Sequence, residues 1–150
     1  MLWVQGKNFI VGAALFALGH LLYFAAFCTR VPFHRGDLLP SAALFAGSAA
    51  FLLLYPRFDF GGALMQAVCM IYALIISCMV GKAFSNLRRE RNITNVVLAV
   101  GSAMFFFSDL MLVLYYFADA AHIVDTLCLF TYYPGQCLLA HALYHHVNEA

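Results

Sequence analysis

Five long apolar stretches, separated by short polar connections, account for most of the chain. A helix needs about 20 apolar residues to cross the hydrocarbon core of a bilayer, and each stretch is close to that length. None of them alternates apolar and polar residues with the period of two that a half-buried strand requires. The stretches cover residues 9–28, 38–55, 62–81, 95–117 and 123–144. We therefore predict an all-α fold: a polytopic transmembrane helical bundle, forming a single domain with about five membrane-spanning helices.

Composition supports the same class of protein. Of the 150 residues, 65% are hydrophobic and only 10% are charged, whereas average soluble domains hold roughly 45–50% apolar and about 25% charged residues. This balance excludes a soluble globular domain, a disordered chain and a fibrous protein. The formal net charge of +1 leaves no basic excess for nucleic acid, so the partner we expect is the lipid bilayer.

The Lys and Arg residues are unevenly distributed over the connections, and this distribution predicts the orientation in the membrane. The N-terminal leader and the second connection hold one each, Lys7 and Arg57. The first and third connections hold the other six, which are Arg30, Arg35, Lys82, Arg88, Arg89 and Arg91. With these two connections in the cytoplasm, the chain is a multi-pass integral membrane protein with its N-terminus outside and its C-terminus cytoplasmic.

Asp109 is the only Asp, Glu, Lys or Arg well inside any predicted span. Such a group at the bilayer centre costs on the order of 2.5–3.5 kcal/mol, so we expect it to face the interior of the bundle. Desolvation favours the neutral carboxylic acid, which is the form that general acid catalysis requires. The alternative is an interhelical hydrogen bond that only holds the bundle together.

His20 and Tyr72 are further candidates for a polar centre. His20 shares a helix face with Tyr23 at i+3, and a neutral imidazole can orient either a carboxyl group or a water molecule. Tyr72 lies seven residues before Met79, again on one face. The alternatives are a histidine that only bonds another helix and a stripe of ordinary packing residues.

The last predicted span carries a third polar group. Tyr132 and Gln136 are four residues apart and share a face, with Pro134 between them. Pro cannot donate to the preceding turn, so we expect a kink, and such kinks with polar neighbours often line a cavity. The alternative is a packing kink in which Gln136 joins two helices.

His141 and His145 are four residues apart, and His146 follows. This spacing can place two imidazoles on a metal ion, but no third ligand has a spacing that completes a site. We therefore expect neither a metal nor a cofactor.

Four short motifs follow one another along the chain in a recognisable order. Residues 9–12 lead into Gly19-His20-Leu21-Leu22-Tyr23, and residues 72–79, residues 101–109 and Thr131-Tyr132-Tyr133 with Gln136 follow. In this order and approximate spacing they resemble the lysoplasmalogenase-like (YhhN) family of membrane proteins. The resemblance extends from residue 9 to about residue 140, and its specificity lies in the joint order of the motifs.

The resemblance implies a hydrolase that acts on a lysophospholipid-type substrate. Such enzymes cleave the vinyl ether bond of lysoplasmalogens to a fatty aldehyde and a glycerophospho-base. By this resemblance Asp109, in the Ser-Asp motif, is the catalytic proton donor, and His20 orients water or relays a proton. The residues that would line the pocket or hold the polar head are Tyr23, Tyr72, Tyr132 and Gln136.

One departure from the family concerns length. The resemblance implies that about three helices and a Gly-Asp motif of the family are absent before Met1. The chain is then either a fragment with a misassigned start or a degenerate member, and both alternatives allow it to be inactive as it stands.

A non-catalytic lipid-binding or transport-related membrane protein is the main functional alternative. An enzyme predicts a cavity that converges on Asp109, whereas a transporter predicts a path open to both faces and repeated helices. A purely structural Asp109 predicts no cavity beside it.

Overall fold

Five long helices and one short 3-10 turn make up the described chain. A computed structural model describes the backbone of residues 2–149 and the side chains of residues 9–144. The elements are α1 (Leu2–Arg30), η1 (Arg35–Asp37), α2 (Leu38–Leu54), α3 (Ala63–Arg89), α4 (Ile93–Phe117) and α5 (His122–Glu149). No strand occurs among the residues described, so the predicted all-α fold is confirmed.

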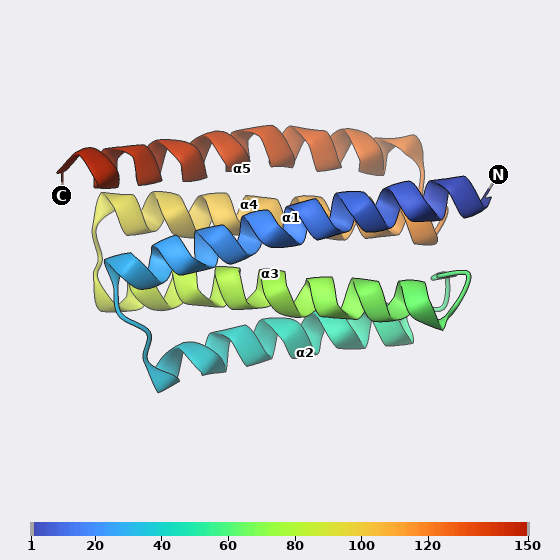
Figure 1. Cartoon of the computed structure of the whole chain (residues 1–150), viewed down its shortest axis with the longest axis horizontal. Helices are drawn as coiled ribbons and strands as arrows, with labels where there is room; N and C mark the ends of the chain where they lie inside the picture. The colour runs from blue at the N-terminus through green and yellow to red at the C-terminus, as the bar shows by residue number, and fades with distance from the viewer. Residues whose placement is uncertain (1, 150) are drawn as a thin grey trace.

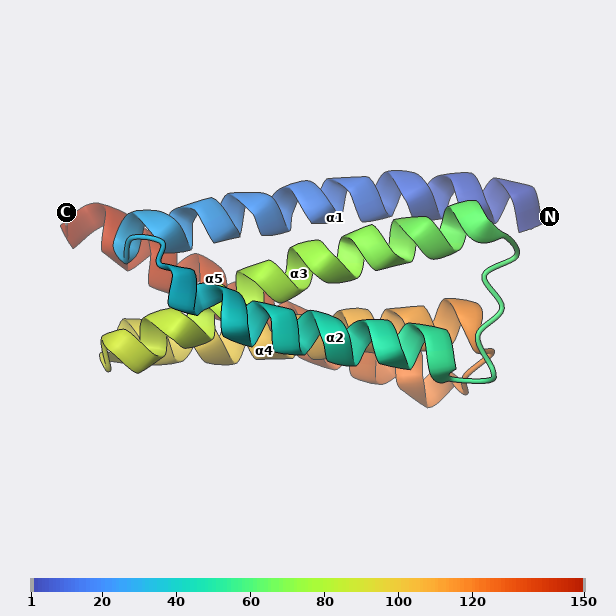
Figure 2. The same cartoon turned by 90° about the horizontal axis from the view of Figure 1, so that it is seen from below.

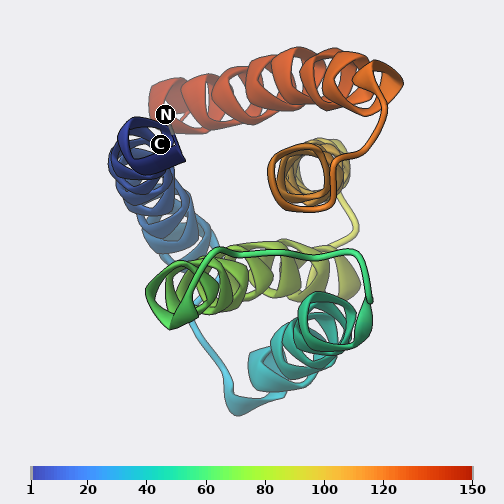
Figure 3. The ribbon, with the colours of Figure 1, turned by 90° about the vertical axis from the view of Figure 1, so that its right-hand side faces the viewer.

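The helices run up and down along one long axis, each antiparallel to the one before it (Figure 1). Seen end-on, α5, α4, α3 and α2 follow one another across the bundle, and α1 lies beside them (Figure 3). α3 is central because it packs against α1, α2 and α4, while α5 packs along α4. In the view turned by 90°, α1 lies next to α3 (Figure 2). Side chains from α1, α3 and α4 can therefore meet in the interior.

Every helix except α2 extends further than the apolar pattern predicts. α1 ends at Arg30, and α3 continues to Arg89. Lys82, Arg88 and Arg89 are therefore helical residues rather than part of a connection, which shrinks to residues 90–92. The physical reason is that the polar residues in the last turns of α3 bond to the α1–α2 connection, so the helix does not stop where its apolar run ends.

Four helical segments in the described part of the chain are long and apolar enough to cross a membrane. They are Phe9–Arg30, Arg35–Leu54, Ala63–Arg89 and Ile93–Phe117, and they coincide with the first four predicted spans. The fifth predicted span lies in α5, which contains polar residues around Pro134 and continues through that proline without ending. That α5 crosses the membrane stays a prediction. The course of α5 along α4 favours it (Figure 1).

Two helix pairs approach closely where one of the helices has a glycine. A Cβ added to Gly81 of α3 would lie 2.6 Å from the backbone nitrogen of Ser41 in α2. Between α4 and α5, a Cβ at Gly101 would lie 3.2 Å from the backbone oxygen of Gly135. Small residues at such crossings let helix backbones pack directly together, as is common between helices in lipid.

An apolar cluster drawn from four helices packs against the polar centre described below. Its buried members are Phe27, Ile76, Met79, Val80, Ala83, Leu98, Phe105, Leu139 and Ala142. Many large apolar side chains lie instead on the outer surface, such as Leu15 and Phe130. Exposed apolar residues of this kind are expected where lipid, rather than water, surrounds the helices.

Candidate active site

Three polar side chains from three helices meet in the interior of the bundle. His20 comes from α1, Tyr72 from α3 and Asp109 from α4, and we call them the triad. At 1.5 Å per residue, Asp109 lies about 12 Å from the Phe117 end of α4, and Tyr72 lies about 14 Å from the Ala63 end of α3. The triad therefore lies well inside the helices, about a third of the way along α3 and α4 from these ends.

Hydrogen bonds join the three members of the triad. The Tyr72 hydroxyl donates to Asp109 Oδ2 over 2.7 Å. His20 Nε2 lies 2.8 Å from the Tyr72 hydroxyl oxygen and 3.2 Å from Asp109 Oδ2. His20 is 1% exposed and Asp109 is 7% exposed. The carboxyl group thus faces polar partners in the interior and not the acyl chains of the bilayer.

The hydrogen bonds of the triad converge on one oxygen of the Asp109 carboxyl group. His20 Nδ1 is buried and has no hydrogen-bond partner in the described structure. A positively charged ring carries a proton on both nitrogens, so it would leave a buried donor unpaired. With the proton on Nε2, both donors to the carboxyl group end on Oδ2 of Asp109. Oδ1 of Asp109 then receives neither of these donors.

Besides a small cavity of about 40 Å³, two larger cavities border the triad. The larger, of about 340 Å³, is lined by Tyr72 and Asp109, together with apolar residues of α1, α3 and α4. The smaller, of about 200 Å³, is lined by His20, Tyr23 and Gln136 among others. A cavity beside Asp109 is what an enzyme or a lipid-binding protein requires, and a carboxyl group with a purely structural role does not require one.

Of the remaining predicted site residues, Tyr23 and Gln136 line the smaller cavity, and Tyr132 packs against a ring that lines it. Tyr23 is one helical turn from His20, and its hydroxyl donates to Gln136 Oε1 over 2.8 Å, which joins α1 to α5. Tyr132 contacts aromatic rings, with its ring centroid 5.3 Å from that of Phe105. The structure therefore brings all six candidate residues to one region, five of them through side-chain hydrogen bonds and Tyr132 through ring packing.

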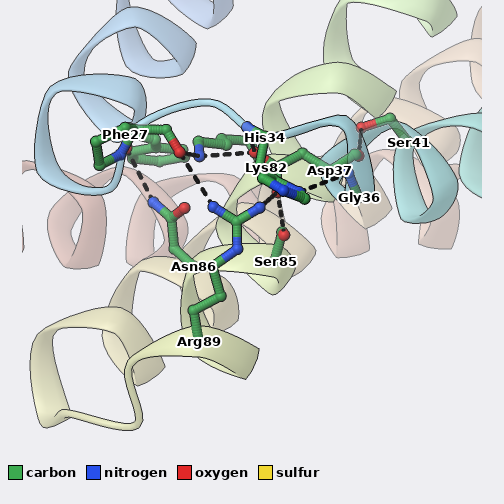
Figure 4. Close-up of polar contacts among 10 residues, drawn as sticks. Phe27, His34, Gly36, Asp37, Ser41, Lys82, Ser85, Asn86 and Arg89 are labelled. Carbon is green, nitrogen blue, oxygen red and sulfur yellow. Dashed lines mark hydrogen bonds and ion pairs between the residues drawn. The ribbon is translucent and has the colours of Figure 1, made fainter.

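A second polar cluster lies at the end of the bundle that carries the α1–α2 and α3–α4 connections (Figure 4). Asp37 Oδ2 accepts from Lys82 Nζ and from the backbone nitrogen of His34, each over 2.9 Å. Asp37 Oδ1 accepts from Ser85 Oγ and from the Arg89 guanidinium. Lys82 is 0% exposed and Asp37 is 1% exposed, so this ion pair is buried.

This Asp37 cluster fastens the α1–α2 connection to α3. Lys82 Nζ and Arg89 Nη1 both donate to the backbone oxygen of Pro32, over 3.3 and 3.1 Å. Asn86 Nδ2 donates to the backbone oxygen of Phe27 over 2.9 Å. The cluster thereby ties the end of α1 and the following connection to the last turns of α3.

The two buried carboxyl groups have opposite surroundings. Asp37 is paired with two cations and two further donors, which favour the ionised carboxylate. Asp109 has no Lys or Arg partner in the part of the chain that the structure describes, and its neighbours are a histidine and a tyrosine. Of the two, Asp109 is the group suited to donate a proton.

The apolar pattern does not predict the Asp37 cluster, because Lys82 and Arg89 follow the end of an apolar run. A signal is nonetheless present in the sequence. Lys82, Ser85, Asn86 and Arg89 occupy positions i, i+3, i+4 and i+7, which lie on one face of a helix. A polar face at this spacing predicts a helix that continues and bonds to a neighbouring segment.

The histidines near the C-terminus are only partly described. Among the described residues, no group of three or more His, Cys, Asp or Glu is placed to hold a metal ion. His141 lies in α5, whereas the side chains of His145 and His146 are outside the described residues.

Comparisons with known proteins place nearly the whole chain in one family. A model of the YhhN family matches residues 1–143. The lysoplasmalogenase TMEM86A of Bos taurus is 29% identical over 143 residues, which are 93% of this chain and 57% of that relative. The chain thus spans little more than half the length of this curated relative, and no solved structure matches it. Because the family match covers nearly the whole bundle, this chain belongs to the YhhN family.

Proposed function

We propose that this chain forms the hydrolytic centre of a lysoplasmalogenase-like enzyme, which splits the vinyl ether bond of a lysoplasmalogen into a fatty aldehyde and a glycerophospho-base. Family membership and the similarity to a protein named lysoplasmalogenase support the proposal. The observation that carries it is the Asp109 carboxyl group, which is buried, bordered by a cavity and paired with no cation in the described residues.

The first step is proton transfer from Asp109. The Oδ1 proton moves to the β-carbon of the vinyl ether, and the carbon–carbon double bond supplies the electron pair. The positive charge is then shared by the α-carbon and the ether oxygen as an oxocarbenium ion. The new Asp109 carboxylate stabilises this cation, and the interaction is strong because the site is shielded from bulk water.

Hydration completes the reaction. A water molecule adds to the α-carbon and gives its proton to Asp109, which restores the acid for the next turnover. The resulting hemiacetal collapses when its hydroxyl proton moves to the glyceryl oxygen and the carbon–oxygen bond breaks. The products are the aldehyde and the free glyceryl hydroxyl, and one water molecule is consumed.

The other five residues position the carboxyl group or the substrate. Tyr72 and His20 both contact Asp109 Oδ2, so they orient the carboxyl group and leave Oδ1 for the substrate. His20 also borders the smaller cavity, from which it can orient water or relay a proton. We assign the polar head of the substrate to the Tyr23–Gln136 pair, with Tyr132 packed beside it.

The orientation in the membrane is part of the proposal. Arg30, Arg35, Arg89 and Arg91 lie in or next to the α1–α2 and α3–α4 connections, which share one end of the bundle (Figure 1). By the positive-inside rule this end is cytoplasmic, which places the N-terminus of α1 outside.

Aldehyde release from a lysoplasmalogen by the purified, reconstituted protein tests the function directly. We expect Asp109→Asn to lower kcat by about a hundredfold or more, because the amide cannot donate the proton. Asp119→Asn is the matched control, since Asp119 is exposed beyond α4 and its positive φ of 47° is one that Asn tolerates.

Two outcomes would reject parts of the proposal. Equal activity of the wild type and Asp109→Asn would remove Asp109 from the mechanism. A wild-type protein that binds the lysoplasmalogen and releases no aldehyde would instead be a non-catalytic lipid-binding or transport-related protein.

A further inference from the structure

The 340 Å³ cavity extends from the triad toward the N-terminal end of α1. Its lining on α4 runs from Asp109 to Tyr116, and its lining on α1 runs from Phe16 to Phe9. Seven residues of helix correspond to about 10 Å, so the cavity continues about that far along the bundle. Between its two ends the lining is formed mainly by small and apolar residues, including Gly12, Ala13, Val68, Leu112 and Val113.

Hydrogen-bonding groups lie on the opposite side of the triad. The 200 Å³ cavity is bordered by His20, Tyr23 and Gln136. An amphiphile whose reactive bond lies at Asp109 therefore meets an apolar cavity in one direction and polar side chains in the other. Hydrocarbon gains about 0.8 kcal/mol for each methylene buried from water, so only one of the two orientations suits its chain.

We infer that the 340 Å³ cavity holds the hydrocarbon chain of the lysophospholipid, and that Gly12 determines which chain lengths fit. This inference rests on the substrate class of the proposed function. Gly12 lies eight residues before His20, or about 12 Å along the helix. A Cβ added at Gly12 would meet no atom within 4 Å, so the space beside it is open. A large side chain there would stop a long chain and leave room for a short one.

Two matched substitutions distinguish the effect of filling the cavity from the general effect of replacing a helical glycine with leucine. Gly12→Leu fills the space beside the cavity. Gly47→Leu makes the same exchange in the middle of α2, where a Cβ also meets no atom within 4 Å and the cavity is not bordered. Both positions are inside helices, where Leu is favoured over Gly, so neither variant is expected to unfold the protein.

The first experiment maps the chain without using catalysis. The probe is a saturated-ether lysophosphatidylcholine with a hexadecyl chain and a diazirine at the chain end, and the adducts are located by mass spectrometry. We expect adducts in the α1, α3 and α4 segments around Phe9, Val68 and Tyr116. Adducts confined to the side of Leu15 and Gln136 would overturn the inference, because those residues border the smaller cavity.

The second experiment compares hexyl and hexadecyl saturated-ether lysophosphatidylcholines, with affinity taken from the rise in Tm with ligand concentration. We expect Gly12→Leu to weaken hexadecyl binding by about tenfold or more and hexyl binding by less than about twofold. Gly47→Leu is expected to change neither. Equal effects of Gly12→Leu on both ligands, no effect on either, or no saturable binding to the wild type would each overturn the inference.

These readouts also separate the inference from the proposed function. A wild type that shows the expected adducts and chain-length dependence, but releases no aldehyde, would reject the hydrolase and retain the chain site. If the wild type releases aldehyde, but Gly12→Leu changes the affinity for the hexyl and hexadecyl ligands equally, the hydrolase is retained and the role of Gly12 is rejected.

Discussion

The Tyr72 hydroxyl donates to Oδ2 of Asp109 over 2.7 Å, so a single hydrogen bond joins α3 to α4 at the point of the proposed proton transfer. The bond ends on the same carboxyl oxygen that lies 3.2 Å from His20 Nε2. Two donors on one oxygen orient the carboxyl group and leave Oδ1 without either of them. Asp37, by contrast, has both oxygens engaged, and its role is to hold segments of the chain together.

Tyr72→Phe tests the positioning role of this hydroxyl because it removes the hydrogen bond and keeps the ring. A hydrogen bond of this kind contributes about 0.5–1.5 kcal/mol, so we expect kcat to fall up to about tenfold with little change in KM. Steady-state aldehyde release measures both constants. Tyr133→Phe is the control, because Tyr133 is 62% exposed. A higher KM with unchanged kcat would assign the Tyr72 hydroxyl to substrate binding instead.

His20→Ala removes the second donor to Asp109 and opens the smaller cavity. We expect turnover to fall by more than about tenfold, which is within the range that positioned proton-transfer groups contribute. His20→Gln should recover part of the loss, because its amide N–H can still donate a hydrogen bond. Turnover that is unchanged by His20→Ala at saturating substrate would make His20 a structural residue.

The helices could be predicted from the sequence because the thickness of the hydrocarbon core sets the length of an apolar run. The centre of the site could be predicted for a related reason. A carboxyl group at Asp109 and an imidazole at His20 are too costly in lipid unless they face polar partners. The contacts themselves could not be predicted, because they depend on how each helix is rotated. The Tyr23–Gln136 bond, for example, joins residues in the first and last helices.

The Asp37 cluster shows where the apolar pattern fails. Charged residues after an apolar run are equally compatible with a solvated connection and with a helix end that packs on another segment. The choice depends on partners distant in sequence, here the backbone oxygen of Pro32 and the carboxylate of Asp37. Their position could not be derived from the residues around Lys82 alone.

The orientation can be checked by cysteine labelling. In a background without the five native cysteines, we expect Asp59→Cys in the α2–α3 connection to react with an impermeant maleimide on intact cells. Glu90→Cys in the α3–α4 connection should react only after permeabilisation, because the Arg-rich end is expected in the cytoplasm. Both side chains are exposed, so access to the reagent depends on the side of the membrane. The reverse labelling would invert the proposed orientation.

Gly81→Ala tests the close approach of α2 and α3. Its Cβ would lie 2.6 Å from the backbone nitrogen of Ser41 and 2.7 Å from its Cα, and backbone atoms cannot rotate away. We expect a loss of about 1–3 kcal/mol in the free energy of unfolding, measured by SDS titration in mixed micelles. Gly47→Ala, with no atom within 4 Å of its Cβ, should be neutral or stabilise by up to about 1 kcal/mol. Equal stabilities of the two variants would contradict the close packing at Gly81.

Lys82→Met should destabilise the bundle because it removes one of the two cations that neutralise a buried carboxylate. Losing one partner of a buried ion pair costs about 3–5 kcal/mol, and we expect the lower part of that range because Arg89 stays in place.

Asp37→Asn should also destabilise, since Lys82 is 0% exposed and would lose its carboxylate partner. If the pair acts as one unit, the double variant loses clearly less than the sum of the single losses. Arg88→Met, at an exposed position, is the control. Additive losses in this cycle would mean that Asp37 and Lys82 stabilise the fold independently of each other.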